Sequence, residues 1–342
     1  MYDYFLILYY YLFFYVKYDI LNKILFNVKG DIMEENYVVT SYINPDLDGI
    51  SCMYAYKEFI EKCGRKSNYY ISGVPKKEVS IVCDMFGISL NPIEKIGKHD
   101  NIILVDTNSD LYIEDSIIKE NVTEIIDHHV KSESSKKFVN ANLTIELIGA
   151  AATLVGKRFM EYSLDISDSS AILLYYGIVS NTINFKSKNT SKKDKEVAKW
   201  LKSKCSKIDD SKIEEIFRKK SIIEKGSMKN EIEASNPVPI NGSKNVIIGQ
   251  LEIVEIDKFL DENEDIIKQI LEEENKSKNP DFIFCNIIDI LNGKSTLYSS
   301  DESTKQALNN EFNYLFEDNI CNLNDLITRK ELFKKLKNHY NN

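Results

Sequence analysis

The stretch Ser41-Tyr-Ile-Asn-Pro-Asp-Leu-Asp-Gly49 decides the fold of this chain. It directly follows the apolar run Tyr37-Val-Val-Thr40, which has the β-branched and aromatic composition of a strand. The stretch therefore ends a strand with two carboxylates, Asp46 and Asp48, that are one residue apart. Hard divalent cations prefer carboxylate oxygens as ligands, so this pattern indicates a metal site.

Two further apolar runs end in acids or imidazoles, Ile102-Ile-Leu-Val105 before Asp106 and Val122-Thr-Glu-Ile-Ile126 before Asp127-His128-His129. In an open parallel sheet the carboxyl ends of the strands share one crevice. We therefore expect four side chains to converge there, those of Asp46, Asp48, Asp106 and His128. Carboxylates with an imidazole suit Mn²⁺, Mg²⁺ or a related divalent ion, and a carboxylate able to bridge favours a pair of ions.

The composition narrows the class of protein. A chain of 342 residues, 43% of them hydrophobic, is expected to form two domains. Its formal charge of −9 argues against a long nucleic acid as the main partner, because such binding needs a broad basic face. The six cysteines show no CxxC spacing and lie mostly in apolar segments, as reduced thiols do, which predicts a cytoplasmic protein.

The first 32 residues form a separate segment. Its apolar, Tyr-rich part, 4–16, is only thirteen residues long, whereas a membrane span needs about 20. It also lacks the flanks of a signal peptide. We expect 1–32 to be a loose or artefactual extension, the folded protein to begin at Met33, and the chain to have no stable association with membranes.

Strand and helix patterns alternate over 37–205, which predicts a doubly wound, mainly parallel α/β domain. We place this domain at 33–205, with helices at 50–63, 76–86, 149–162, 169–182 and 191–204 and a further strand at 68–72. The charged segment 206–226 has few residues suited to a core and is expected to be a helical linker. A smaller α+β domain is expected at 227–342, with strands at 245–254, 282–290 and 295–299 and a helix at 256–274.

Seven motifs, in this order and spacing, resemble the DHH phosphoesterase superfamily with a second domain of the DHHA2 type. They are Asn44-Pro-Asp-Leu-Asp48, Val105-Asp106, Asp127-His128-His129, Gly149-Ala-Ala-Ala-Thr153, Gly177-Ile-Val-Ser-Asn-Thr-Ile-Asn-Phe-Lys-Ser187, Val246-Ile-Ile-Gly-Gln250 and Thr328-Arg-Lys330. The resemblance points to manganese-dependent family II inorganic pyrophosphatases or close relatives. It implies an active site in the cleft between the two domains, where two ions activate a water that attacks pyrophosphate.

The resemblance also implies a role for each matched residue. The metal ligands would be Asp46, Asp48, Asp106 as the bridge, and His128, with Asn181 at a further ligand position. Asp127 would support the neighbouring imidazole, and His129 would contact substrate or assist the leaving group. Phosphate oxygens would be bound by Arg329, Lys330 and, with a softer alignment, Lys229. The cofactor would be Mn²⁺, Co²⁺ or Mg²⁺, and the substrate a small phosphate compound.

Two departures from the family pattern affect the expected ligands. Tyr42 stands where the first motif of the family has a histidine ligand, and Asn181 stands where an aspartate is expected. A neutral phenol is a poor ligand, and an amide oxygen lacks the charge that holds a divalent ion tightly. Thr107 also replaces a histidine. We expect weaker metal binding on each side of the site.

Several alternatives stay open at this point. Taken alone, Asp-x-Asp after a strand is a turn and helix cap, with Asp48 capping a helix that begins near Ile50. Arg329-Lys330 taken alone is a solvated helix start. Besides pyrophosphate hydrolysis, the function could be a phosphodiesterase on short or cyclic dinucleotides, or a catalytically weakened regulator that binds phosphate or nucleotide. The oligomeric state is open, with a homodimer as one option.

Overall fold

A computed structural model of the chain describes residues 36–232, 237–240 and 244–340. The expected extension, 1–32, lies outside the described residues. The first sheet has five strands in the order β2-β1-β3-β4-β5. Their bounds are β1 Asn36–Thr40, β2 Lys66–Tyr69, β3 Asn101–Val105, β4 Val122–Asp127 and β5 Asn142–Ile145. The pairs β1–β3, β3–β4 and β4–β5 are parallel, so their carboxyl ends lie at one edge of the sheet.

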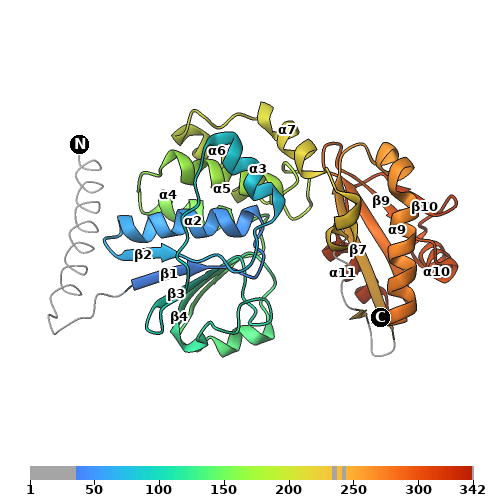
Figure 1. The fold of residues 1–342 in the computed structure, drawn as a ribbon, viewed down its shortest axis with the longest axis horizontal. Coiled ribbons are helices and arrows are strands. Elements are labelled where there is room, and N and C mark those ends of the chain that lie inside the picture. Colours follow the sequence, from blue (N-terminus) through green and yellow to red (C-terminus); the bar gives the residue numbers. More distant parts are fainter. Residues whose placement is uncertain (1–35, 233–236, 241–243, 341–342) are drawn as a thin grey trace, which may run out of the picture. The chain divides into compact units, whose positions relative to one another are not determined.

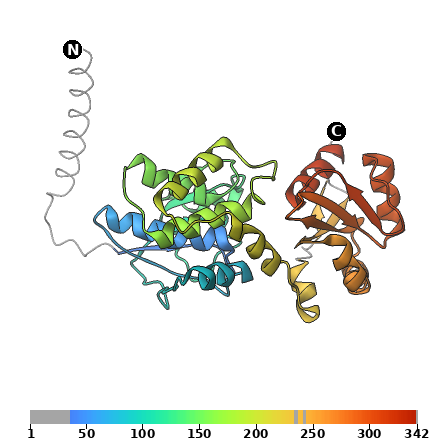
Figure 2. The same cartoon turned by 90° about the horizontal axis from the view of Figure 1, so that it is seen from above.

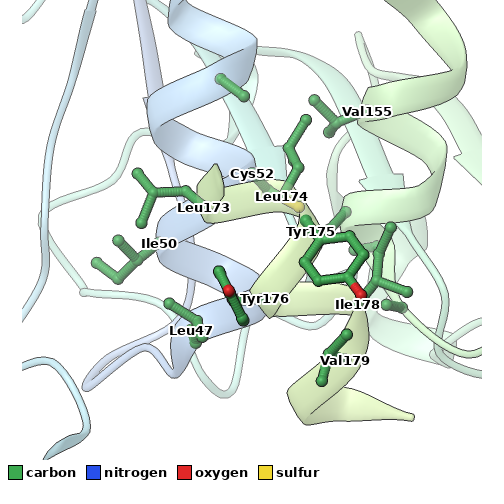
Figure 3. Close-up of a cluster of buried hydrophobic side chains, with 14 of the residues drawn as sticks. Leu47, Ile50, Cys52, Val155, Leu173, Leu174, Tyr175, Tyr176, Ile178 and Val179 are labelled. Atoms are coloured by element: carbon green, nitrogen blue, oxygen red, sulfur yellow. The ribbon is translucent and has the colours of Figure 1, made fainter. Parts of the chain in front are cut away.

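Helices cover one face of this sheet (Figure 1, Figure 2). They are α2 Leu47–Lys62, α3 Lys77–Phe86, α4 Ala151–Glu161, α5 Asp168–Asn181, α6 Lys192–Lys204 and α7 Ser211–Lys220. The middle helix, α5, is buried without interruption over 170–180, as expected for a helix that is apolar all round. Figure 3 shows its Leu173 and Tyr176 beside Leu47 and Ile50 of α2.

The other face of the first sheet is covered by the chain between β3 and β5 and by its short 3₁₀ helices, η1 Lys119–Asn121 and η2 Glu133–Lys137. Ile113, Ile117 and Phe138 pack there against alternate side chains of β3 and β4. The two neighbouring strands thus have apolar partners on both faces. This is the arrangement in which strands read as continuous apolar runs.

The second sheet also has five strands, in the order β10-β9-β8-β7-β6. Their bounds are β6 Val238–Pro239, β7 Asn245–Ile253, β8 Phe282–Asp289, β9 Lys294–Tyr298 and β10 Ile320–Leu323. Only the pair β7–β8 is parallel among the described pairings. One face packs against α9 Ile256–Lys278 and the short α8 Met228–Glu231, and the other against α10 Glu302–Phe312 and α11 Arg329–Tyr340. In the part of the chain that the structure describes, no helix is both long and apolar enough to cross a membrane.

The structure confirms the expected fold class, a mainly parallel α/β sheet with helices followed by a smaller domain with its own sheet. The domain limits 33–205, 206–226 and 227–342 stay predictions. Two details were wrong. The first helix begins at Leu47 and is capped by Asp46, because the Asp46 carboxylate accepts the Gly49 N–H. The strand expected at 68–72 lies at Lys66–Tyr69.

The expectation that 206–226 has few residues suited to a core was also wrong. Ile213, Ile216 and Phe217 of α7 are buried in the same core as α2 and α5. Their spacing of three and four residues places them on one face of the helix. The half-exposed Lys212 and Lys219 lie off this face, and the many lysines of the segment hide the apolar stripe from a reading of composition alone.

We predict that Phe217→Ala lowers the free energy of unfolding by about 3 kcal/mol, because it removes a fully buried ring from a packed core. Lys212→Ala on the exposed face of α7 should change it by less than about 0.5 kcal/mol. Urea unfolding followed by circular dichroism measures both. Equal, small effects would show that α7 is a connector after all.

Candidate active site

The two acids of the first motif are held differently. Asp46 is the N-cap of α2 and accepts the Gly49 N–H at 3.1 Å. Asp48, in the first turn of α2, is 1% exposed and accepts the backbone N–H groups of Ala151 at 2.8 Å and Ala152 at 2.7 Å. Both N–H groups belong to the first turn of α4, whose positive end favours a carboxylate. Asp48 was expected as a possible cap of its own helix, α2. It instead caps the neighbouring helix α4.

Asp106 and His128 bring the ends of β3 and β4 together. The His128 Nδ1 atom lies 3.0 Å from the Ile148 carbonyl oxygen, so this nitrogen donates and Nε2 carries a lone pair. That Nε2 lies 3.4 Å from Asp106 Oδ1. Two electron-rich atoms face each other there, and Asp106 Oδ1 is buried without a hydrogen-bond partner. A cation between them would satisfy both atoms, so the residues present fit a metal ion.

The backbone at Asp106 is unusual. Its φ is 57°, in the left-handed region that non-glycine residues seldom occupy, although aspartate tolerates it better than most. The residue directly follows β3, so the turn aims its carboxylate toward the imidazoles instead of continuing the strand. Ligand atoms of Asp106, His128 and His129 all lie within 4.8 Å of one another. Strain at such a point is typical of functional sites.

Asp127 organises the second histidine. Its Oδ1 accepts from His129 Nδ1 at 2.8 Å, and Asn108 Nδ2 donates to its Oδ2. Burial by itself raises the pKa of Asp127, but the hydrogen bonds from His129 and Asn108 outweigh it and hold the pKa below its usual value. Asp127 is thus a fixed anion that orients His129 and leaves Nε2 of this ring available. Asn108 is a supporting residue that the sequence did not reveal.

The charges of the acids indicate a missing counter-charge. Burial raises the pKa of the Asp106 carboxyl well above its ordinary value, and the Asp46 carboxylate raises it further. Burial and the Asp106 carboxylate do the same to the pKa of Asp48. Buried like charges destabilise each other unless a cation compensates them. A divalent ion would reverse these shifts.

Tyr42 and Asn181, the two departures, both hydrogen-bond to the protein. The Tyr42 hydroxyl accepts the Asp46 N–H at 3.0 Å. Burial, Asp46 and Asp106 raise the pKa of Tyr42 well above its usual value, so the phenol keeps its proton. Asn181, the last residue of α5, donates from Nδ2 to Asp48 Oδ2 at 2.8 Å. The structure thus brings both residues to the acids that the sequence predicted as ligands.

A pocket of about 150 Å³ is lined by part of this set, and Tyr42, Asp106 and His129 are not among its lining residues. Its lining includes Asp46, Asp48, His128 and Asn181 from the first sheet and its helices, and Gln250, Arg329 and Lys330 from the chain of the second sheet. Its small volume suits a small ligand rather than a drug-sized one. Lys229 is not part of the lining. It lies 3.3 Å from Glu273 and 3.7 Å from Glu274 of α9.

The basic pair at the pocket stands at the start of α11. Thr328 and Glu331 form a reciprocal cap, in which the Thr328 N–H donates to Glu331 Oε2 at 2.7 Å and the Glu331 N–H donates to Thr328 Oγ1 at 3.4 Å. The Arg329 N–H donates to Gln250 Oε1 at 2.8 Å. The pair is therefore both a helix start and a part of the pocket. A helix N-terminus with Arg and Lys favours an anion.

Residues 36–178 match the DHH family, N-terminal domain. This match covers the first sheet and the helices of the chain as far as α5. A probable manganese-dependent inorganic pyrophosphatase of Clostridium acetobutylicum is 27% identical over 303 residues, which cover 87% of this chain and 96% of that relative. A probable manganese-dependent inorganic pyrophosphatase of Streptococcus thermophilus is 26% identical over 306 residues, which cover 86% of this chain and 94% of that relative. The family assignment made from the motifs is thereby confirmed.

A solved structure shows the same fold. The putative family II inorganic pyrophosphatase of Methanococcus jannaschii superposes with a TM-score of 0.68 at 24% identity, over 90% of this chain and 100% of that one. This likeness in fold extends over both sheets of the chain. The second domain, which the family match at 36–178 does not reach, thus shares the fold of that neighbour.

No sequence pattern reveals the cluster of charged side chains at the pocket. Lys220, the last residue of α7, lies 2.6 Å from Glu78 of α3 and 2.6 Å from Glu252 of β7. Glu78 also accepts the Leu47 N–H at 3.0 Å, between the two acids of the first motif, and the Ser180 hydroxyl at 2.5 Å, beside Asn181. Lys220 outweighs the effect of burial and lowers the pKa of Glu78. The cluster is thus part of the pocket lining, and Glu78 also holds the chain at Leu47 and Ser180.

Asp194 is a second supporting acid, and the sequence does contain its signal. Ser191-Lys-Lys-Asp194 is a capping box at the start of α6. The fully buried Asp194 carboxylate also accepts the Gly149 N–H at 3.0 Å and the Thr153 hydroxyl at 2.5 Å. It therefore fixes the turn whose next N–H groups bind Asp48.

We predict that Lys220→Met lowers the free energy of unfolding at pH 7 by about 3 kcal/mol, because the buried Glu78 carboxylate and the partly exposed Glu252 carboxylate lose their counter-charge. Lys219→Met, on the neighbouring exposed lysine that pairs with Glu215 on its own helix, should cost less than about 0.5 kcal/mol. Urea unfolding at several pH values measures both.

The pH dependence follows from the direction of the Glu78 shift. A lowered folded-state pKa gives stability that is present above the ordinary carboxyl pKa, near 4.5, and is lost as the pH falls. In Lys220→Met the uncompensated Glu78 takes up a proton more readily. The deficit of the variant should therefore shrink between pH 7 and pH 4. A deficit that stays constant over this range would contradict the ionic origin.

Proposed function

We propose that the protein hydrolyses inorganic pyrophosphate to two phosphates, with a divalent ion, Mn²⁺, Co²⁺ or Mg²⁺, as cofactor. The observation that carries this proposal is the pocket itself, which joins carboxylates and an imidazole at one end with Arg329 and Lys330 at the other. Pyrophosphate is a small, highly charged anion that needs counter-charges at both ends. The names of the relatives support the same reaction.

The ion would be held by side chains from the set Asp46, Asp48, Asp106 and His128. When bound, it would supply positive charge and lower the pKa of a water, which makes a nucleophile at neutral pH. The helix caps at Asp46 and Asp48 and the Ile148 carbonyl at His128 fix the direction of these groups before substrate arrives. Such preorganisation reduces the cost of reaching the transition state.

The remaining groups act on the phosphates. Arg329 and Lys330 would bind phosphate oxygens, aided by the positive end of α11. His129, with Nδ1 held by Asp127, can present Nε2 to an oxygen of the leaving phosphate. Lys229 would have to break its ion pair with Glu273 to bind phosphate. Arg329 and Lys330 already line the pocket, so we assign phosphate binding to them.

A second candidate function is a weakened phosphate-binding regulator. It is favoured by Tyr42 and Asn181, whose hydroxyl and amide groups bond to the protein where charged or imidazole ligands are expected. We also propose the reducing cytoplasm as the location, since all six cysteines are free thiols and five of them are buried.

We predict metal-dependent release of phosphate from pyrophosphate, faster than from tripolyphosphate or a linear dinucleotide. Asp106→Asn should weaken Mn²⁺ binding by at least about 100-fold, because it removes the acid nearest to His128, and should abolish hydrolysis at limiting metal. Calorimetry and a colorimetric phosphate assay on the same preparation measure both. Asp115→Asn, on an exposed acid of the same loop, is the matched control and should behave as wild type.

Three outcomes separate the hypotheses. If the protein hydrolyses the dinucleotide but not pyrophosphate, it is a phosphodiesterase and the proposed substrate is wrong. Binding of pyrophosphate without hydrolysis, under every metal, would favour the regulator. An Asp106→Asn protein with wild-type metal affinity would show that the metal site lies elsewhere.

A further inference from the structure

Asn181 lies at the centre of the pocket among three acceptor atoms. Its Nδ2 is 2.8 Å from Asp48 Oδ2, 3.1 Å from the Gly149 carbonyl oxygen and 3.3 Å from His128 Nε2. The residue ends α5, and that helix is buried on all sides up to Ser180, so its position is fixed by the core. An aspartate here would add a negative charge to these acceptors. An asparagine instead adds two donors.

The orientation of this amide follows from its partners. Asp48 Oδ2 and the Gly149 carbonyl can only accept hydrogen bonds, so an amide oxygen turned toward them would face two oxygens. The two N–H bonds of Asn181 are therefore directed to Asp48 and Gly149. His128 Nε2, at the longer distance, is left with its lone pair. The amide oxygen points away from both carboxylate and carbonyl.

Asp48 is saturated by this arrangement. Its Oδ2 accepts from Ala151 and Asn181, and its Oδ1 accepts from Ala152 and, at 3.7 Å, from the Cys52 thiol. A carboxylate offers about four lone-pair sites, and four donors occupy them. An ion bound to Asp48 Oδ2 would have to displace the amide of Asn181 and turn its N–H groups away from Gly149.

Asp106 shows the opposite condition. Its Oδ1 is buried, has no hydrogen-bond partner, and faces the free Nε2 of His128 at 3.4 Å. Asp46 lines the pocket together with His128, and its Oδ1 accepts the Gly49 N–H at 3.1 Å. The Asp106 carboxylate thus lacks a partner that a cation could supply. The Asp48 carboxylate already has hydrogen-bond donors where a cation would bind.

We propose that the protein binds a single divalent ion, held by Asp106, His128 and Asp46, and that the Asn181 amide fills the place beside Asp48 where a second ion would lie. Asp48 is then an anchor between α2 and α4 instead of a ligand. This inference rests on the proposed metal-dependent function and replaces the pair of ions that the family resemblance implies with a single ion.

The count of bound Mn²⁺ per chain tests this proposal. Wild type equilibrated with excess Mn²⁺ and passed through a desalting column should hold one ion per chain, with the six-line paramagnetic resonance spectrum of an isolated Mn²⁺. Asn181→Asp should hold two, with the broadened spectrum of a magnetically coupled pair. Asn189→Asp adds the same charge to the same pocket but not beside Asp48, and should hold one.

A second readout uses stability. Without metal, Asn181→Asp places a carboxylate against Asp48 and the Gly149 carbonyl, so its melting temperature should fall below that of wild type and of Asn189→Asp. Saturating Mn²⁺ should raise the melting temperature of Asn181→Asp more than that of wild type, because two ions stabilise its folded state instead of one.

Two ions in wild type, or one in Asn181→Asp, would overturn the single-ion proposal and leave the proposed hydrolysis standing. No ion in wild type would overturn the proposed metal-dependent function together with it. The wild-type count decides by itself if the variant does not fold.

Discussion

The buried carboxylate of Asp48 is the interaction on which the rest of the site depends. It stands in the first turn of α2 and accepts two N–H groups from the first turn of α4, more than one hundred residues later in the chain. It also receives Asn181 from the end of α5. One anion therefore ties three helices to the edge of the sheet where β1, β3 and β4 end. A carboxylate buried this deeply is stable only because helix ends and an amide surround it.

The same logic of compensated charge extends outward from Asp48. Asp194 fixes the turn before α4, and Glu78 holds the turn before Asp48 while pairing with Lys220. Each of these acids is buried and each has identifiable partners. Asp106 Oδ1 is the exception among the site's acids, because no donor reaches it. In a site where every other acid is matched, an unmatched oxygen opposite an imidazole lone pair is the clearest sign of a missing cation.

The sequence alone predicted the parallel sheet and the convergence of the acids, because strand-ending acids and helical spacing are local patterns. The helices were placed within a few residues, except that the start of the first helix was moved by the Asp46 cap. The sequence did not reveal α7 as part of the core, since its three apolar residues are diluted by lysines. Nor could it reveal Lys220 or Asn108, whose partners are 19 or more residues away and are set only by tertiary packing. The interpretation of Asn181 as a weak ligand followed from its residue type, whereas its two acceptor partners give it a different role.

The unmatched atoms of Asp106 and His128 call for a cation between them. Anomalous X-ray diffraction from crystals soaked in Mn²⁺, measured on both sides of the manganese absorption edge, tests for it most directly. We expect a peak within bonding distance of Asp106 Oδ1 and His128 Nε2, with Asn181 Nδ2 still hydrogen-bonded to Asp48. A map with no peak at Asp106, or with its main peak on Asp48 in place of the amide, would show that the cation does not bind there.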